Sequence, residues 1–421
     1  MRQRMQPHGA TFPLHCSVRA RHIPARPGHT PHGRVAHNPR LRPLAGLSLA
    51  CLAAVLFLSA AVSALAGPRN DDDLKQLTAS LLETKIKPDA IPALYRPEYT
   101  STISAALSLE DPEPVFVVRL PDGPRIYPQR IMVWHEAVNE VVGDATYCIS
   151  YSPLTGVLAA YKGQAGRFMT TFGVDGRLLY NNTVLFDRAT GSLWSQLLGI
   201  AIDGPLRGKV LQRIPAWWTT WGVARDAMPD AKVLATPSGI RRSYGKDPYG
   251  SYLLPGTYYD DDRIMYAVPR LDRRMKPKTR ILGLDVQGQQ LAIDTATVHK
   301  DGVANIDQGP MPLLAVVDRR LDVIRVYDRT VWGKPATFAL KKGSPNRLVD
   351  TESGSEWSID GKAEAGPMKG AVLNELIPVN AMWFAWSSFH PATLVVPTND
   401  AWPAPSQPQP QLNVPGLAPF Q

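Results

Sequence analysis

Twelve residues of this chain recur in the same order at an offset that stays between 162 and 165 residues. The first set is Gly123, Asp187, Gly191, Trp194, Ser195, Gly204, Pro205, Gly208, Leu211, Pro215, Trp221 and Pro229. The second set is Gly288, Asp350, Gly354, Trp357, Ser358, Gly366, Pro367, Gly370, Leu373, Pro378, Trp383 and Pro391. Two copies are too few for a solenoid, so the recurrence predicts two similar lobes built from one duplicated unit.

The recurrence also sets the expected domain boundaries. The two repeat lobes span 115–236 and 281–397, and a connector rich in Tyr and Arg joins them at 237–280. Residues 67–114 hold an N-terminal helix and an extended lead-in, and 398–421 form a Pro-rich tail that we expect to be disordered.

The net charge of +9 comes almost entirely from the start of the chain. Residues 1–66 contain eight of the 46 basic residues and no acidic residue, which leaves 38 basic and 37 acidic residues in the rest. A nearly neutral body lacks the basic surface that nucleic acid requires, so no nucleic-acid partner is expected. Two of the three cysteines also lie within residues 1–66, and the remaining Cys148 has no intramolecular disulfide partner.

The basic and disordered leader at 1–43 precedes an uncharged apolar run at 44–66, which is long enough to cross a bilayer. Arginines precede the run and three aspartates follow it, so its N-terminal side should be cytoplasmic. The sequence Ala64-Leu65-Ala66 fits a signal-peptidase site, so the run is either a cleaved signal peptide or a transmembrane anchor. The expected location is therefore the periplasm, either free or anchored to the inner membrane through residues 44–66. Because residues 1–43 are too long for the n-region of an ordinary signal peptide, one hypothesis places the true start at Val35.

The order of the remaining elements predicts a strand-rich α+β fold with few helices. The strongest helical pattern is Gln129–Val142, because its apolar residues recur at spacings of three and four. Other helices are expected near Trp217–Ala227 and Thr295–Asn305, and a short capped helix begins at Asp71. The expected strands of the first lobe are Thr146–Ser152, Gly156–Tyr161, Arg167–Phe172, Leu178–Phe186 and Gly191–Trp194.

The first lobe contains the residues best suited to chemistry. On a helix, His135 and Asn139 lie one turn apart with Glu136 beside them. They form either a general base or metal ligand with its orienting partners, or a solvated helix face. On the following strand, Cys148 and Ser152 share one face with Ser150, where Cys148 either lines a pocket or is a small buried hydrophobe.

The familiar motifs of enzymes and metal sites are missing from the sequence. It contains no His-Glu-x-x-His, no Cys-x-x-Cys, no phosphate loop and no G-x-S-x-G elbow. Three histidines follow the leader, so no metal site is predicted, and no cofactor is specified. The aspartates at 260–262 lack the spacing of a calcium loop and are expected to form a solvated loop with internal ion pairs.

Several short motifs, weak individually, together resemble one family. They are Ile91-Pro92-Ala93-Leu94, Trp134-His135-Glu136, Tyr151-Ser152-Pro153-Leu154-Thr155-Gly156, Leu193-Trp194-Ser195-Gln196, Tyr244-Gly245-Lys246-Asp247-Pro248-Tyr249 and Trp383-Phe384-Ala385-Trp386. Over about residues 90–397 the chain resembles the bacterial family catalogued as domain of unknown function 3179.

The resemblance implies an exported or membrane-tethered protein and no particular chemistry. The family usually has Cys at the position of Ser152, so any thiol role in relatives is lost here. Cys148 does not replace it, because four residues along a strand span about 13 Å.

Two functions remain open. One is a non-catalytic binding or interaction protein with a small-molecule or peptide cleft in or between the lobes. Its candidate ligand-binding residues are Tyr180, Asn182, Tyr244, Asp247 and Tyr249. The other is an enzyme, or a metal- or thiol-dependent protein, with its site in the first lobe. Its candidate residues are His135, Glu136, Asn139, Cys148 and Ser152.

Overall fold

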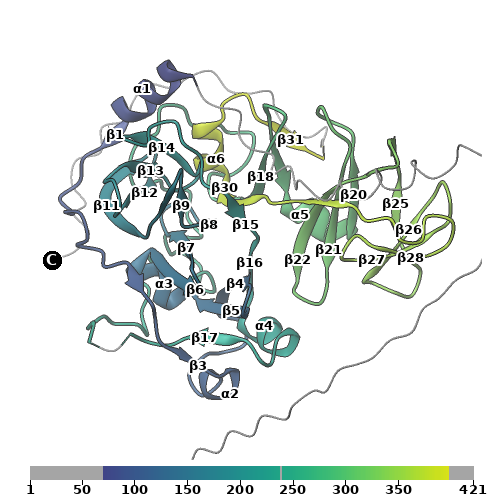
Figure 1. Cartoon of the computed structure of the whole chain (residues 1–421), viewed down its shortest axis with the longest axis horizontal. Helices are drawn as coiled ribbons and strands as arrows, with labels where there is room; N and C mark the ends of the chain where they lie inside the picture. Colours follow the sequence, from purple (N-terminus) through teal and green to yellow (C-terminus); the bar gives the residue numbers. More distant parts are fainter. Residues whose placement is uncertain (1–69, 238, 398–421) are drawn as a thin grey trace, which may run out of the picture. The chain divides into compact units, whose positions relative to one another are not determined.

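A computed structural model describes residues 70–237 and 239–397. Six short helices and 31 strands make up this part of the chain, so the expected strand-rich α+β class is confirmed (Figure 1). The expected leader, apolar run and tail lie outside the described residues. Within the described ranges, no helix is long and apolar enough to span a membrane.

The first segment, residues 114–234, forms three groups of paired strands. The strands of the first group are β4 (Pro114–Leu120), β5 (Gly123–Pro128), β16 (Ala216–Thr220) and β17 (Lys232–Leu234). The second group consists of β6 (Ala137–Val142), β7 (Ala145–Ser152), β8 (Val157–Lys162) and β15 (Arg213–Ile214). The third group consists of β11 (Phe172–Leu179), β12 (Asn182–Asp187), β13 (Leu193–Ser195) and β14 (Ile200–Asp203). The pairing orders are β16-β4-β5-β17, β6-β7-β8-β15 and β11-β12-β13-β14.

The second segment, residues 280–396, pairs its strands in the same order. Its first group is β30 (Val379–Met382), β18 (Arg280–Val286), β19 (Gln289–Asp294) and β31 (Leu394–Val396). The second is β20 (Val303–Ile306), β21 (Leu313–Asp318), β22 (Val323–Asp328) and β29 (Asn374–Leu376), and the third is β25 (Phe338–Leu340), β26 (Arg347–Asp350), β27 (Glu356–Ser358) and β28 (Ala363–Ala365). In the first group of each segment one pair is parallel, namely β17 with β5 and β31 with β19. The remaining pairs of the three groups are antiparallel.

A nine-stranded sheet joins the two segments. Strand β30 pairs with β18 of its own segment and, through Asn380 and Leu158, with β8 of the first segment. Figure 1 shows β30 between β18 and the β8–β15 region. The sheet continues on one side through β7 and β6 to β2 (Leu94–Tyr95), so part of the lead-in is paired rather than free.

The predicted helix at Gln129–Val142 is wrong in its second half. Helix α3 (Gln129–His135) ends at Glu136, whose φ of 56° is left-handed, and the chain continues as strand β6. All six residues of β6 pair with β7 across the turn at Gly143. Four of the six are Val or Ala, a run that satisfies both the helix and the strand pattern, and pairing with β7 in the hairpin and with β2 decides for the strand.

The same error occurs at two other predicted helices. Helix α5 (Thr295–Asp301) stops at Gly302, where φ is 79°, before strand β20. The range Trp217–Ala227 consists of strand β16 followed by helix α4 (Trp221–Ala227). The predicted strand at Leu178–Phe186 is a hairpin, because Tyr180 and Asn181 both have positive φ and reverse the chain between β11 and β12.

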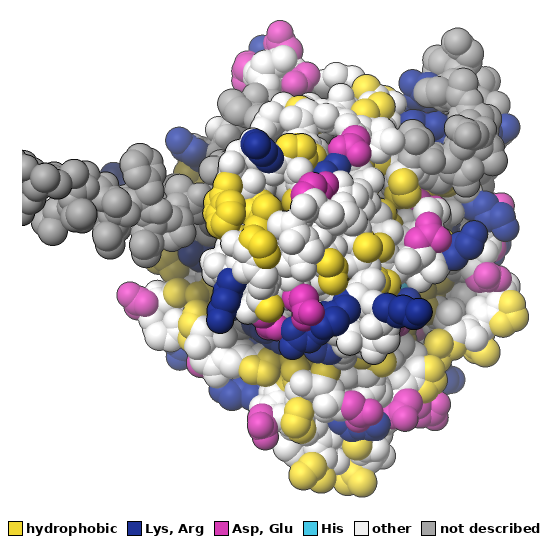
Figure 2. All heavy atoms as spheres, turned by 90° about the vertical axis from the view of Figure 1, so that its right-hand side faces the viewer, with side chains coloured by type: hydrophobic (Ala, Val, Ile, Leu, Met, Phe, Trp, Pro, Cys, Tyr) yellow, Lys and Arg dark blue, Asp and Glu magenta, His cyan; other side chains and the backbone are white. Residues whose placement is uncertain are grey.

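The remaining segments pack around these strands. The Asn70 side chain caps the N-terminus of helix α1 (Asp71–Ala79), and Leu74 and Leu77 of this helix are buried. The lead-in also forms β3 (Tyr99–Thr100) and α2 (Thr102–Ala105). The described connector residues between β17 and β18 form neither helix nor strand. On the face in Figure 2, basic and acidic side chains are interspersed, as a nearly neutral body implies.

Candidate functional site

His135 lies at the end of helix α3 and is fully buried, so the predicted solvated helix face is wrong. Its Nδ1 lies 2.7 Å from the Pro92 carbonyl oxygen and its Nε2 lies 2.8 Å from the Tyr244 hydroxyl. Burial lowers the pKa of His135, which favours a neutral ring that donates through Nδ1 and accepts through Nε2. Both ring nitrogens are therefore used to hold the lead-in and the connector.

Glu136 begins a different polar cluster. Thr183 donates a 2.6 Å hydrogen bond from Oγ1 to Glu136 Oε2, and the hydroxyls of Thr183 and Ser152 are 3.0 Å apart. The Glu136 carboxylate borders a cavity of about 30 Å³ together with Thr183 and Tyr249. Burial raises the pKa of Glu136 to about 7, against the opposing effect of the Thr183 hydrogen bond.

Asn139 lies on strand β6 instead of a helix, and its amide group is occupied by backbone. Its Nδ2 donates to the Phe172 carbonyl over 2.8 Å, and the Phe172 N–H donates back to Oδ1 over 2.7 Å. Asn139 Nδ2 also donates to Leu94 over 3.2 Å. Asn139 therefore fastens β6 to β11 and to the lead-in, and it does not orient His135.

The expected alternation along strand β7 is present. Cys148 is fully buried in a cluster that includes Phe172 and Trp194, whereas Tyr147 and Ile149 face a second cluster on the opposite side. Burial raises the pKa of the Cys148 thiol to about 12. Cys148 does not line the cavity beside Glu136, so the structure brings Glu136 together with Ser152 and separates both from Cys148.

The predicted ligand-binding residues of the connector contact the first segment. Asp247 Oδ2 accepts hydrogen bonds from Gln129 and from the Tyr259 hydroxyl, each over 2.7 Å, and Oδ1 accepts from the Tyr249 backbone. Burial raises the pKa of Asp247 despite these donors. The interactions hold the connector against helix α3.

Tyr180 and Asn182 occupy structural positions around the β11–β12 hairpin. The Tyr180 hydroxyl donates to Ser80 over 3.2 Å. Asn182 donates to Gln196 over 2.7 Å and to Thr155 over 3.1 Å. These two side chains therefore interact with the protein itself, and neither borders the larger cavity described next.

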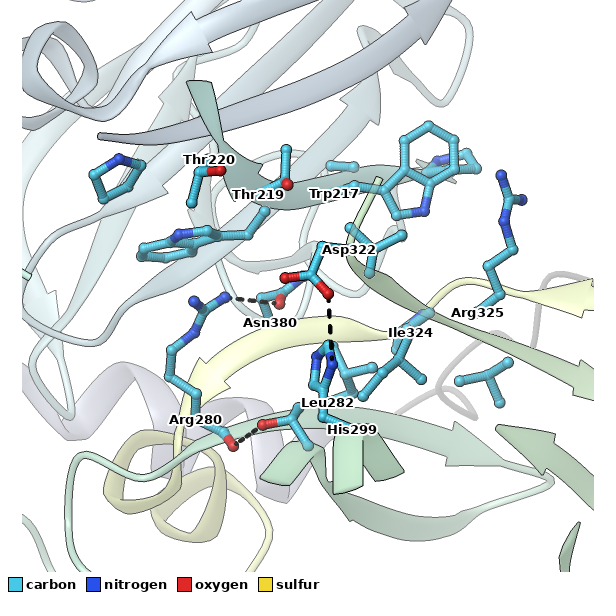
Figure 3. Close-up of a pocket in the computed structure, with 18 of the residues that line it drawn as sticks. Trp217, Thr219, Thr220, Arg280, Leu282, His299, Asp322, Ile324, Arg325 and Asn380 are labelled. Carbon is cyan, nitrogen blue, oxygen red and sulfur yellow. Dashed lines mark hydrogen bonds and ion pairs between the residues drawn. The ribbon is translucent and has the colours of Figure 1, made fainter. Parts of the chain in front are cut away.

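The larger cavity, which we call the cleft, has a volume of about 450 Å³ and lies between the two segments. Strand β16 of the first segment contributes one wall and strands β18, β22 and β30 of the second contribute others (Figure 3). Polar and aromatic residues that line the cleft include Trp217, Trp218, Thr219, Thr220, Arg280, His299, Asp322 and Asn380. None of these was singled out as a ligand-binding candidate from the sequence.

A family model for a protein of unknown function (DUF3179) matches residues 88–393. The chain belongs to the DUF3179 family. Neither the curated proteins nor the solved structures contain a match to it. The matched range includes the Glu136 cluster and every residue that lines the cleft.

The charged side chains that line the cleft of this DUF3179 protein differ in whether they have a partner of opposite charge. Arg325 lies 2.9 Å from Asp318 and 3.0 Å from Glu375. His299 Nδ1 lies 3.8 Å from Asp322 Oδ1. Arg280 differs from Arg325 because its side-chain partners are the Asn380 amide oxygen at 3.3 Å and the ring of Trp218 at 3.9 Å.

Metal ligands are not grouped in the described ranges of this DUF3179 protein, where no cluster of three or more His, Cys, Asp or Glu side chains could hold an ion. In the acidic run at 260–262, Asp261 pairs with Lys278 at 2.8 Å and with Arg263 at 2.5 Å. The expected internal ion pairs of this loop are therefore present.

The residues that line the cleft were not predicted from the sequence, because they come from distant parts of the chain. Trp218 and Arg280 are 62 positions apart, and Asn380 is a further 100 positions along. No motif spacing can reveal such a group. The only available signal was the expectation that a cleft forms between lobes.

Proposed function

We propose that this protein is a non-catalytic binding protein whose ligand occupies the cleft between the first and second segments. One observation carries the proposal: a cavity of about 450 Å³ is lined by residues of both segments. Ligand pockets span roughly 300–1,000 Å³ and favour such interfaces. Apolar side chains such as Leu282 and Ile324 line the cleft together with polar and charged side chains, so a small molecule there would find both apolar surface and groups that fix its orientation.

We further propose that the two segments are duplicated lobes. Their common pairing order supports this, and so do equivalent side-chain bonds. Asn305 exchanges two hydrogen bonds with the Phe338 backbone, as Asn139 does with Phe172. The same correspondence places Gly302 opposite Glu136, so the left-handed residue after the first-segment helix is a glutamate where the second segment has glycine.

The proposed location is outside the cytoplasmic membrane, with residues 44–66 acting as a signal peptide or an anchor. Support comes from the apolar run, its arginine-rich N-terminal side and the Ala-Leu-Ala sequence at 64–66. N-terminal sequencing of the native protein tests cleavage: a first residue at Gly67 supports a signal peptide, whereas peptides from 44–66 in the mature protein support an anchor.

Filling the cleft tests the binding function. Thr220 borders the cleft and its side chain makes no capping hydrogen bond to helix α4, so Thr220→Trp should fill space at little cost in stability. Thr330→Trp is the matched control, because Thr330 is exposed on β23 (Thr330–Val331) and lies outside the cleft lining. We expect small aromatic compounds detected by saturation-transfer NMR to bind wild type and Thr330→Trp, and to lose binding to Thr220→Trp. Equal binding to all three proteins would contradict the proposal.

An enzyme remains the second candidate, and one observation favours it. Glu136 is a buried carboxylate in a left-handed conformation beside a small cavity, with the hydroxyls of Thr183 and Ser152 in contact with each other next to it. Backbone conformations of this kind in non-glycine residues cluster at functional sites. A turnover assay of Glu136→Gln against wild type tests this candidate once a reaction is found, and unchanged turnover would remove it.

A further inference from the structure

Arg280 is the first residue of strand β18 and stands where the connector enters the second segment. Its guanidinium borders the cleft and lies 3.9 Å from the ring of Trp218 on the first segment. Figure 3 shows it directed toward Asn380 on β30, to which it donates a hydrogen bond. The Trp218 ring is itself packed edge-on against Tyr252 of the connector, with 5.0 Å between ring centroids. These contacts fix the guanidinium plane against the cleft wall.

The guanidinium has no acidic partner in the described ranges. None of their ion pairs within 4.0 Å includes Arg280. Of the two carboxylates that line the cleft, Glu375 pairs with Arg325 at 3.0 Å, and Asp322 forms no ion pair with Arg280 within 4.0 Å. The side-chain hydrogen bond from Arg280 to Asn380 is long at 3.3 Å and uses one nitrogen of a group that carries several N–H donors.

Holding the charge of Arg280 in this position without an acidic partner costs free energy. Burial lowers the pKa of Arg280, although arginine remains charged at physiological pH. A charge removed from water is stabilised chiefly by an opposite charge and by hydrogen bonds to its free donors. The Trp218 ring supplies a smaller stabilisation through its face. A ligand that brings its own negative charge would complete the site.

We propose that the cleft binds a small organic acid whose carboxylate pairs with Arg280 and whose apolar or aromatic body packs against the tryptophan wall. This inference rests on the proposed binding function and names the class of ligand. A carboxylate matches the planar fork of guanidinium donors. Trp217 and Leu282 give the rest of the ligand an apolar surface.

The other charges of the cleft favour a single negative charge. Asp322 borders the same cavity, with its side chain 55% exposed, and His299 is its partner at 3.8 Å. A second carboxylate on the ligand would meet this like charge and be disfavoured. We therefore expect monocarboxylates to bind more tightly than dicarboxylates of similar length.

A pair of nearly isosteric probes tests the inference. Phenylacetate and phenylacetamide differ in charge while sharing the same body, and competition NMR can measure both on the full chain. We expect phenylacetate to bind wild type about tenfold more tightly than the amide, which is the effect of one charge-assisted contact. Arg280→Met should abolish this preference and leave amide binding within about twofold of wild type.

Two further variants complete the design. Arg280→Lys keeps the charge and should retain part of the preference, and it serves as the test if Arg280→Met fails to fold. Arg167→Met removes an exposed arginine outside the cleft lining and should retain the whole preference.

The outcomes separate the two proposals. Equal affinity of wild type for acid and amide, with both lost in Thr220→Trp, would overturn the carboxylate inference and keep the binding function. Binding of both probes unaffected by Thr220→Trp would reject the cleft as the binding site altogether. A preference that persists in Arg280→Met and Arg280→Lys alike, or failure of both probes to bind wild type, would also overturn the inference.

Discussion

Trp357 donates a hydrogen bond from its indole Nε1 to Asp350 Oδ2 over 2.9 Å, and both residues are fully buried. Trp194 makes the same bond to Asp187 over 3.0 Å in the first segment. In each case the carboxylate also accepts a hydroxyl bond of 2.9 Å, from Ser353 to Asp350 and from Thr190 to Asp187. Each tryptophan thus combines apolar packing with a hydrogen bond to a buried acid.

Replacing either tryptophan by phenylalanine should destabilise the protein by a similar amount. Trp194→Phe and Trp357→Phe each remove one donor to a charged acceptor, which costs about 2–3 kcal/mol of unfolding free energy. Urea denaturation followed by circular dichroism measures this cost. A large difference between the two variants would show that the two hydrogen bonds are not energetically equivalent.

Removing the Asn139 amide should destabilise the protein more than removing the Asn305 amide. Asn139→Ala leaves the Phe172 N–H and carbonyl and the Leu94 carbonyl without their partner, which should cost about 2–4 kcal/mol. The Asn305 side chain is half-buried and forms hydrogen bonds with the Phe338 backbone alone. In Asn305→Ala, water can therefore replace more of the lost hydrogen bonds. Thermal unfolding compares the variants, and hydrogen exchange at the Phe172 amide gives a local readout. Unchanged exchange at Phe172 in Asn139→Ala would contradict the assignment.

Glu136 should make stability depend on pH between about 4.5 and 7. Its ordinary pKa is 4.5 and burial raises it to about 7 in the folded protein, so the folded state holds a proton that the unfolded state releases in this range. The stabilisation is fully present below pH 4.5 and is lost as the pH rises through 7, by on the order of 3 kcal/mol.

The substitution Glu136→Gln removes this titration and keeps an acceptor for Thr183. Relative to Glu136→Gln, wild type should therefore lose stability as the pH rises across that range. Thr183→Val removes the hydrogen bond that favours the ionised carboxylate, so the decline should extend to higher pH. Parallel pH profiles for wild type and Glu136→Gln would refute this account.

Cys148 should resist alkylation in the native protein. Its side chain is fully buried and burial raises the pKa of the thiol to about 12, so the reactive thiolate is scarce and inaccessible. After treatment with N-ethylmaleimide at pH 8, mass spectrometry should find the peptide that contains Cys148 unmodified, and it should be labelled in denaturant. Rapid native labelling would instead support a thiol-dependent function.

Local patterns predicted the features that short-range chemistry decides. The alternation of Cys148, Ser150 and Ser152 on one face of β7 follows from the strand period, and the helix expected to begin at Asp71 is present as α1. The tryptophans that recur in the sequence, at 194, 221, 357 and 383, are almost completely buried. Even the family was recognisable from short motifs, and the match over 88–393 bears this out.

The spacing of apolar residues gave wrong predictions where the same residues can form either a helix or a strand. The apolar residues of 129–142 fit one face of a helix, but Glu136 turns left-handed and the following residues pair with β7 and β2. The predicted polar helix face then disappears: His135, Glu136 and Asn139 point to three different sets of partners. Pairing with the adjacent strand β7 and with the more distant β2 makes this segment a strand, and helical spacing by itself does not reveal that pairing.

By itself the sequence determined the strand-rich class, the family and the recurrence of landmarks, because each depends on residue type and order along the chain. The tertiary structure alone decided where the cleft lies and which charge in it has no acidic partner among the described residues. Trp218, Arg280 and Asn380 meet through the pairing of β30 with both β8 and β18, and that pairing depends on packing between distant strands. A site assembled in this way leaves no trace in local spacing, since each of its residues is held by a different neighbour.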